Sequence, residues 1–266
     1  YEDLSDRYYG NNDVKGPSND HGTHVAGIVG AVRDNNLGTV GIANNVELMI
    51  IRAVPDGDER DKDVANAIRY AADNGARVMN MSFGKGFSPY KEYVDAAIQH
   101  ADSLGVLMIA AAGNESTNVD SSKHYPTPDY INGGSASNYI TVGALSWKTD
   151  STLVAGFSNY GAHSVDLFAP GVDIYSTYPD NTYKMESGTS MAAPVVTGIA
   201  ALIMSYYPEL SAHQVKNIIL QSATKIDRAV YKPGTQQAVP FSQLSRTGGV
   251  VNVYNALKLA EEQSNS

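Results

Sequence analysis

The sequence lacks cysteine and is poor in positive charge. None of its 266 residues is cysteine, which excludes a disulfide framework, a thiolate nucleophile and a cysteine-based zinc site. Lysine and arginine number 19 against 28 acidic residues, giving a formal net charge of −9 and a sequence pI near 5.0. Nucleic-acid binding requires clustered lysine and arginine that neutralise phosphates. We therefore expect no nucleic-acid partner.

The sequence also lacks a long hydrophobic run. Its longest apolar stretch, residues 195–204, contains Thr197 and Gly198 and is shorter than the roughly 20 residues that a membrane-spanning helix requires. We interpret this stretch as a buried core helix and predict no membrane span. No Pro/Ser/Gly-rich linker or charge block divides the chain, so residues 1–266 are predicted to form a single domain.

Short apolar runs alternate with helical patterns along the chain. The apolar runs are residues 46–54, 76–83, 106–112 and 139–145. Two amphipathic patterns between them stop at Gly75 and Gly105, as helices often do. Ser211 and Gln214 predict a capping box for a further helix that ends at Leu220. The alternation predicts an α/β fold with three layers, α/β/α, around a mostly parallel central sheet.

A serine at residue 190 is placed as an enzyme nucleophile would be. It lies in the run SGTSMAAP, residues 187–194, directly before an apolar helical pattern. Gly188 allows a sharp turn, and the small residues that follow let the helix start pack closely, so the positive helix end can stabilise an anion. The alternative is an ordinary N-cap serine.

Two upstream motifs supply the groups that a serine nucleophile needs. His21 lies in DHGTHVAG, residues 20–27, and Asn114 lies in AAAGNE, residues 110–115. With Ser190 they provide a base, an oxyanion donor and a nucleophile for acyl transfer. Asn114 could instead cap a turn. His21 and His24 also have a spacing that suits a metal pair, but no motif supplies a third ligand, so no metal is predicted at this site.

With these three motifs the chain resembles the subtilisin-like serine peptidases, in which they occur in the same order. The resemblance extends from about Gly22 through the sequence GGVVN at residues 248–252. It implies a serine endopeptidase in which His21 is the general base, Ser190 is the nucleophile of an acyl-enzyme, and Asn114 is the side-chain donor of the oxyanion hole.

The resemblance also concerns substrate and cofactors. It implies that a protein or peptide substrate pairs as an added strand with Ser82, Phe83 and Gly84, which also form one wall of the primary specificity pocket. It implies no required cofactor, with calcium as a candidate structural ion at the loop of residues 34–39. It further implies a secreted protein or one of the cell envelope.

One part of the family pattern is missing. The family's third catalytic residue is an aspartate in an Asp-Thr-Gly or Asp-Ser-Gly turn after an N-terminal strand, and neither tripeptide occurs in this sequence. The aspartates that precede His21 lack this context: Asp3, Asp6, Asp13 and Asp20. We expect the strand and its aspartate to lie upstream of Tyr1 and to reach the site as part of an N-terminal propeptide or a separate fragment.

The missing aspartate leaves two functions in competition. The first is the serine endopeptidase, with low activity in the chain as written. The alternative is a catalytically silent peptide-binding module that keeps the subtilisin-like fold. The combination of His21, Asn114 and Ser190 favours the enzyme, because peptide binding alone does not require these three chemistries together, whereas the missing aspartate favours the module.

Overall fold

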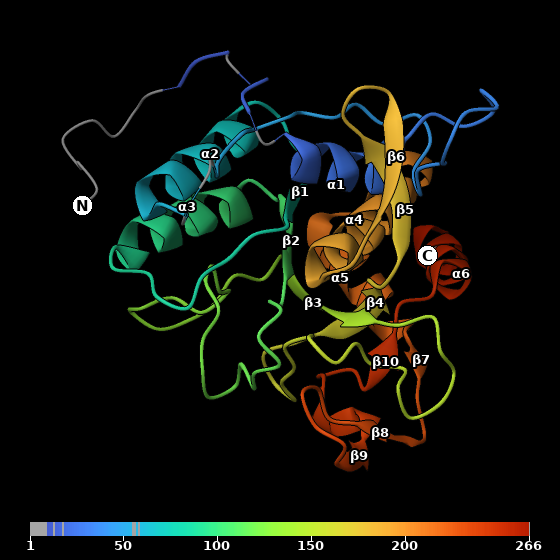
Figure 1. Ribbon diagram of the computed structural model, residues 1–266. Coiled ribbons are helices and arrows are strands. Elements are labelled where there is room, and N and C mark those ends of the chain that lie inside the picture. The colour runs from blue at the N-terminus through green and yellow to red at the C-terminus, as the bar shows by residue number, and fades with distance from the viewer. Residues whose placement is uncertain (1–9, 13, 18, 55–56, 58, 266) are drawn as a thin grey trace.

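A six-stranded sheet runs through the middle of the molecule (Figure 1). The structure, a computed structural model, describes residues 10–12, 14–17, 19–54, 57 and 59–265. The strands, in their order across the sheet, are β1 (Val78–Met81), β2 (Leu107–Ala111), β3 (Tyr139–Leu145), β4 (Leu167–Pro170), β10 (Gly249–Val250) and β7 (Thr224–Lys225). Neighbouring strands are parallel except for β10 and β7. The prediction of a mostly parallel central sheet is confirmed.

Helices cover both faces of this sheet (Figure 1). The first face carries α2 (Asp61–Asp73) and α3 (Lys91–Ser103). The second face carries α4 (Thr189–Tyr206), α5 (Ala212–Gln221) and α6 (Val253–Ser264). A further helix, α1 (Asp20–Gly30), packs against α4 and against the hairpin of β5 (Ile174–Tyr178) and β6 (Thr182–Glu186). A second hairpin joins β8 (Ala229–Tyr231) to β9 (Ala238–Pro240), followed by a 3₁₀ turn (Phe241–Gln243). The layers are therefore α/β/α, as predicted.

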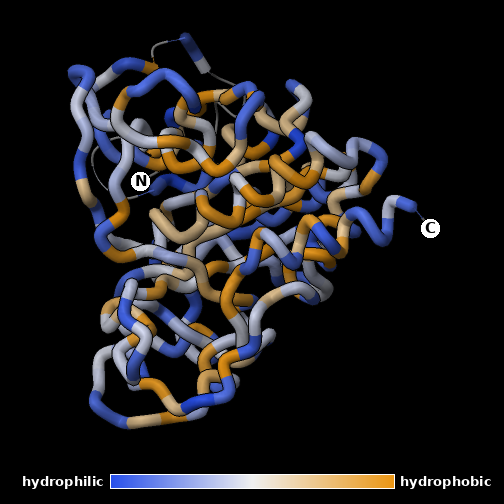
Figure 2. Tube along the Cα trace, turned by 90° about the vertical axis from the view of Figure 1, so that its right-hand side faces the viewer, coloured by the Kyte–Doolittle hydropathy of each residue, from blue (hydrophilic) through white to orange (hydrophobic). Residues whose placement is uncertain are grey.

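Strand β2 shows why the chain adopts this architecture. All five of its residues are buried. Leu107 and Ile109 pack into the core beneath α4, α5 and α6, whereas Met108 and Ala110 pack against α2 and α3. Because successive side chains point to opposite faces, a strand covered on both faces reads as a continuous apolar run. Figure 2 shows hydrophobic residues concentrated along the inner helices and strands.

The predicted helix ends are confirmed. Gly75 follows α2 and Gly105 follows α3, with φ of +86° and +73°, a conformation that glycine adopts at low cost. Ser211 accepts a hydrogen bond from the backbone N–H of Gln214, whose side chain accepts one from the Ser211 N–H, so the capping box is formed. Local sequence therefore fixes where these helices begin or end.

The expectation of a strand over residues 46–54 is wrong. The structure assigns these residues to no helix or strand, and β1 pairs only with β2 among the described strands. Leu48, Met49 and Ile50 are 44%, 43% and 55% exposed. A strand requires hydrogen bonds from a neighbour, and no described strand forms them with this segment.

Helix α4 is the buried core helix that the sequence predicts. Within the described ranges it alone has the length and apolar composition of a membrane-spanning helix. About two thirds of this apolar window, 67%, is buried inside the protein, where Val196, Ile199 and Ile203 pack on the sheet.

We expect Ile109→Ala to lower the free energy of unfolding by about 2–5 kcal/mol, because it removes buried methyl groups from the centre of the sheet and leaves a cavity. The measurement is urea unfolding followed by circular dichroism. Ile131→Ala is the matched control, because Ile131 is 62% exposed, and we expect a change within about 0.5 kcal/mol. Equal losses in the two variants would contradict this assignment of the core.

Candidate active site

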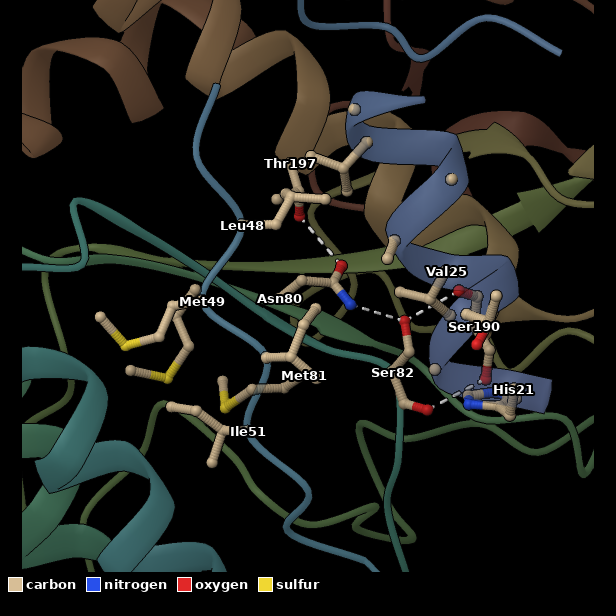
Figure 3. Close-up of a pocket in the computed structure, with 18 of the residues that line it drawn as sticks. His21, Val25, Leu48, Met49, Ile51, Asn80, Met81, Ser82, Ser190 and Thr197 are labelled. Atoms are coloured by element: carbon tan, nitrogen blue, oxygen red, sulfur yellow. Dashed lines mark hydrogen bonds between the residues drawn. The ribbon is translucent and has the colours of Figure 1, made fainter. Parts of the chain in front are cut away.

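Ser190 is the second residue of α4, and the start of this helix is fixed to strand β1. Pro194 has no backbone N–H, so the Ser190 carbonyl lacks its usual partner one turn along the helix. The Ser82 hydroxyl fills that role and donates to the Ser190 carbonyl at 2.8 Å. In return the Ser190 Oγ donates to the Ser82 carbonyl at 3.2 Å. Figure 3 shows these two residues joined at the end of β1.

Asn114 follows β2, and its side chain is anchored by Thr189 at the start of α4. The Asn114 Oδ1 accepts from the Thr189 N–H at 2.9 Å and from the Thr189 hydroxyl at 3.0 Å. The Thr189 hydroxyl also accepts from the Gly113 N–H at 3.1 Å, and Thr189 is fully buried. Both contacts to Asn114 use its carbonyl oxygen. They leave its NH₂ group without a hydrogen-bond partner in the described part of the chain.

The free NH₂ group of Asn114 lies beside the start of α4. A Cβ built on Gly188 would lie 3.7 Å from Asn114 Nδ2, and Gly188 precedes α4 directly. The first backbone N–H groups of a helix have no partner within the helix and carry partial positive charge. An amide donor next to such N–H groups can stabilise an oxyanion on the carbon atom that becomes bonded to the Ser190 Oγ.

His21 is the second residue of α1 and lines the same cavity as Ser190 and Asn114. No hydrogen bond joins His21 to Ser190, although both residues are described. This is common before substrate binds, when catalytic contacts are often long. The surrounding protein partly desolvates the ring and lowers its pKa, while the negative charges of Asp20 and Glu186 oppose this shift. The neutral imidazole, which can accept a proton, is therefore favoured.

The two neighbours of His21 on α1 are engaged elsewhere. The Asp20 carboxylate accepts from the Tyr178 hydroxyl at 2.8 Å, and this bond lowers the pKa of Asp20. His24 is buried, and its Nε2 lies 3.0 Å from the Lys184 carbonyl oxygen. Over the described residues, no hydrogen bond or ion pair joins His21 to a carboxylate. Asp3, Asp6 and Asp13 lie outside the described residues.

One cavity of about 1610 Å³ brings the predicted site residues together. His21, Asn114, Ser190 and the predicted substrate-binding residues Ser82, Phe83 and Gly84 all line it. The cavity continues between β1 and residues 46–54, where Leu48, Met49 and Ile51 lie opposite Asn80 and Met81 (Figure 3). Residues far apart in the sequence therefore converge at the carboxyl ends of parallel strands, where ligands bind in α/β folds.

Sequence reasoning missed several supporting residues. No motif considered above identifies Thr189, which anchors Asn114, or the hydroxyl of Ser82. Pro194 inside an apolar helix was a signal that a carbonyl in the preceding turn needs another donor. Glu59 also lines the cavity, and its Oε1 accepts from the Gly84 N–H at 3.1 Å. No pattern in the sequence points to Glu59, because this contact depends on tertiary packing.

The candidate calcium loop at residues 34–39 is poor in carboxylate side chains. Residues 34–39 contain one carboxylate, Asp34, and the Oδ1 of Asn35 accepts from the Leu37 N–H at 3.0 Å. Calcium requires about six to eight oxygen ligands. Within the described ranges, no cluster of three or more His, Asp or Glu side chains could hold a metal. Calcium binding at residues 34–39 stays a prediction.

A serine at a helix start, a free amide donor and an imidazole on a parallel α/β sheet define a serine hydrolase site. The profile of the subtilase family matches residues 1–246. The chain is 41% identical over 217 residues to subtilisin DY of Bacillus licheniformis, covering 80% of this chain and 73% of that protein. It is 40% identical over 240 residues to the thermophilic serine proteinase of Bacillus sp. (strain AK1), covering 90% of this chain but 52% of the relative.

A solved structure agrees with these matches. A cold-adapted subtilisin-like serine proteinase superposes with a TM-score of 0.65 at 33% identity, over 88% of this chain and 72% of that one. The chain belongs to the subtilase family. By homology it is a subtilisin-like serine protease.

We expect Thr189→Val to slow the reaction of Ser190 with a fluorophosphonate by about tenfold or more, because it removes one of the two anchors of Asn114; loss of a whole oxyanion donor costs about 10²–10³. The measurement is the labelling rate of the purified chain. Thr117→Val is the control, since the Thr117 hydroxyl donates to the Glu115 carbonyl and not to Asn114. An unchanged rate in Thr189→Val would show that Asn114 does not need this anchor.

We expect the labelling rate of the chain alone to fall with decreasing pH, with a midpoint below 6.5, the ordinary pKa of histidine. Desolvation lowers the pKa of His21, so the neutral base persists to a lower pH and is lost only as the pH falls through the folded-state pKa. The measurement is labelling rate against pH, with His21→Gln as control. A midpoint above 6.5, or the same midpoint in His21→Gln, would contradict the expectation.

Proposed function

We propose that this protein is an endopeptidase that cleaves peptide bonds through an acyl-enzyme on Ser190. The observation that carries this proposal is the anchoring of Asn114 through its carbonyl oxygen alone. That arrangement leaves an NH₂ donor beside the nucleophile, where an oxyanion forms in acyl transfer. A module that only binds peptides has no need of this donor.

The proposed mechanism assigns one step to each group. The Ser190 Oγ attacks the peptide carbonyl carbon while its proton passes to His21. The Asn114 NH₂ group and the Ser190 backbone N–H hold the resulting oxyanion. His21 then gives its proton to the leaving amine as the carbon–nitrogen bond breaks. Water hydrolyses the ester with His21 again as the base, and this step restores Ser190.

The proposed substrate is a protein or peptide that pairs with residues 82–84 beyond the end of β1. An extended peptide can add to such a segment through main-chain hydrogen bonds. The proposed donor to a substrate carbonyl is the Gly84 N–H. Without substrate, this N–H donates to the Glu59 carboxylate. Substrate would have to displace Glu59 from this N–H.

We also propose that the carboxylate which orients His21 belongs to a strand outside the described residues. Two observations support this proposal. The cavity beside His21 continues between β1 and residues 46–54, so it has the length and apolar lining for an added strand. The neighbouring segment exposes Leu48, Met49 and Ile50. A strand placed there would cover these side chains, and an aspartate at its carboxyl end would lie near His21.

Other parts of the proposal rest on family resemblance. An N-terminal propeptide or a separate fragment is the proposed source of the aspartate-bearing strand. A secreted or cell-envelope location, a single-domain organisation and calcium as a structural ion also stay predictions. No cofactor takes part in the proposed mechanism.

The proposed nucleophile is tested by fluorophosphonate labelling. We expect the chain to be labelled at Ser190, with no labelling in Ser190→Ala and a strong decrease in His21→Ala, because both groups are needed to make the hydroxyl reactive. Ser187→Ala, which changes a serine three residues away, is the control. Equal labelling of wild type and Ser190→Ala would refute the assignment. Absence of labelling together with peptide binding would favour the silent module.

The proposed orienting strand is tested by supplying it. We expect a strand peptide ending in aspartate, added to or fused before the chain, to raise the rate of peptide hydrolysis by up to about 10⁴-fold; in subtilisin, loss of the aspartate lowers kcat by about 3 × 10⁴. The same peptide ending in asparagine is the control. If the chain alone already matches the complemented protein within about tenfold, one of its own carboxylates orients His21.

A further inference from the structure

The imidazole of His124 lies in the gap between two glycines. A Cβ added to Gly84 would lie 2.2 Å from His124 Nε2, and one added to Gly113 would lie 2.8 Å from His124 Cε1. Both distances are shorter than carbon atoms tolerate, so the ring contacts the bare backbone of both glycines. The His124 side chain is only 12% exposed. The ring therefore occupies the space of a Gly84 side chain and shares that of a Gly113 side chain with Asn159 and Glu115.

This gap is adjacent to the reacting groups. Gly113 directly precedes Asn114, the oxyanion donor, and Gly84 is two residues after Ser82, whose carbonyl contacts Ser190. The two segments leave neighbouring parallel strands, β1 and β2, at the same edge of the sheet. The gap between the two glycines therefore adjoins the place where the proposed function puts the peptide carbonyl that Ser190 attacks.

Surrounding groups hold His124 in this position. The Glu115 Oε2 lies 3.5 Å from His124 Nδ1 and accepts from the Asn159 side-chain N–H at 2.6 Å. Glu59 is close enough for its charge to act on the ring. Both carboxylates and His124 line the active-site cavity. The His124 ring thus shortens the gap between Gly84 and Gly113, and the carboxylates of Glu59 and Glu115 flank it.

We infer that His124 closes the inner end of the primary specificity pocket and restricts it to short, uncharged side chains on the residue whose carbonyl is attacked. This inference rests on the proposed function. A phenyl ring and the imidazole cannot occupy the same gap between Gly84 and Gly113. A side chain the size of alanine or serine needs no displacement of His124, and the charges of Glu59 and Glu115 repel an acidic one.

The experiment compares two peptidyl phosphonates that differ only in carrying a methyl or a benzyl side chain next to phosphorus. We expect wild type to react faster with the methyl probe by about tenfold or more. His124→Gly should shift the benzyl-to-methyl rate ratio upward by about tenfold or more, with His124→Asn and His124→Ala intermediate in order of size. The ratio cancels any general loss of Ser190 reactivity. His163→Ala is the control, because His163 is exposed and uses only its backbone in hydrogen bonds.

Failure of this inference is distinguishable from failure of the proposed function. A wild type that prefers the benzyl probe, or a ratio that does not change across the His124 series, overturns the role of His124 while Ser190 remains the nucleophile. If a simple fluorophosphonate does not label Ser190, the proposed function fails. In that case calorimetric titration with peptides that end in alanine or phenylalanine still measures the pocket. If the ratio of the two dissociation constants is the same in wild type and His124→Ala, the inference is overturned.

Discussion

The arrangement of the site depends on the buried hydroxyl of Thr189. This one group accepts from the Gly113 N–H beyond β2 and donates to the Asn114 side chain, while its own residue begins α4. It thereby joins the end of a strand to the start of the helix that carries Ser190, the proposed nucleophile. Because buried polar groups need hydrogen-bond partners, burial of the Thr189 hydroxyl favours these two contacts over other arrangements. The sheet and α4 support both sides of this junction, because they pack together through Ile109, Val142 and Val196.

The sequence predicts the parts of the structure that local chemistry determines. The run at residues 107–111 is apolar throughout because both faces of β2 are covered, and the capping box at Ser211 needs only residues within one turn. Residues 46–54 have the same apolar character, yet they form no strand, because a strand also requires a partner. Composition shows whether a segment can be buried in a sheet and does not show what pairs with it.

The candidate site, like the fold, is predictable from the sequence only where local motifs determine it. Ser190, His21 and Asn114 stand in recognisable local motifs, and the structure places all three around one cavity. The positions of His124 and Glu59 were not predictable, because each depends on contacts with segments that are far away in sequence. The proposed catalytic residues therefore leave a signal in short motifs, whereas the residues proposed to shape the pocket depend on the fold.

The two halves of the proposed mechanism differ in how complete they are within the described residues. The described contacts that anchor Asn114, the proposed oxyanion donor, come from Thr189 at the start of α4, whose hydroxyl also accepts from the Gly113 N–H beyond β2. The proposed base, His21, has less support. Desolvation lowers its pKa, and no described carboxylate is hydrogen-bonded to its ring. A histidine in this state is neutral but holds an accepted proton weakly. A carboxylate beside the ring would reverse that effect by stabilising the imidazolium, so its contribution falls on proton transfer while the oxyanion hole acts independently.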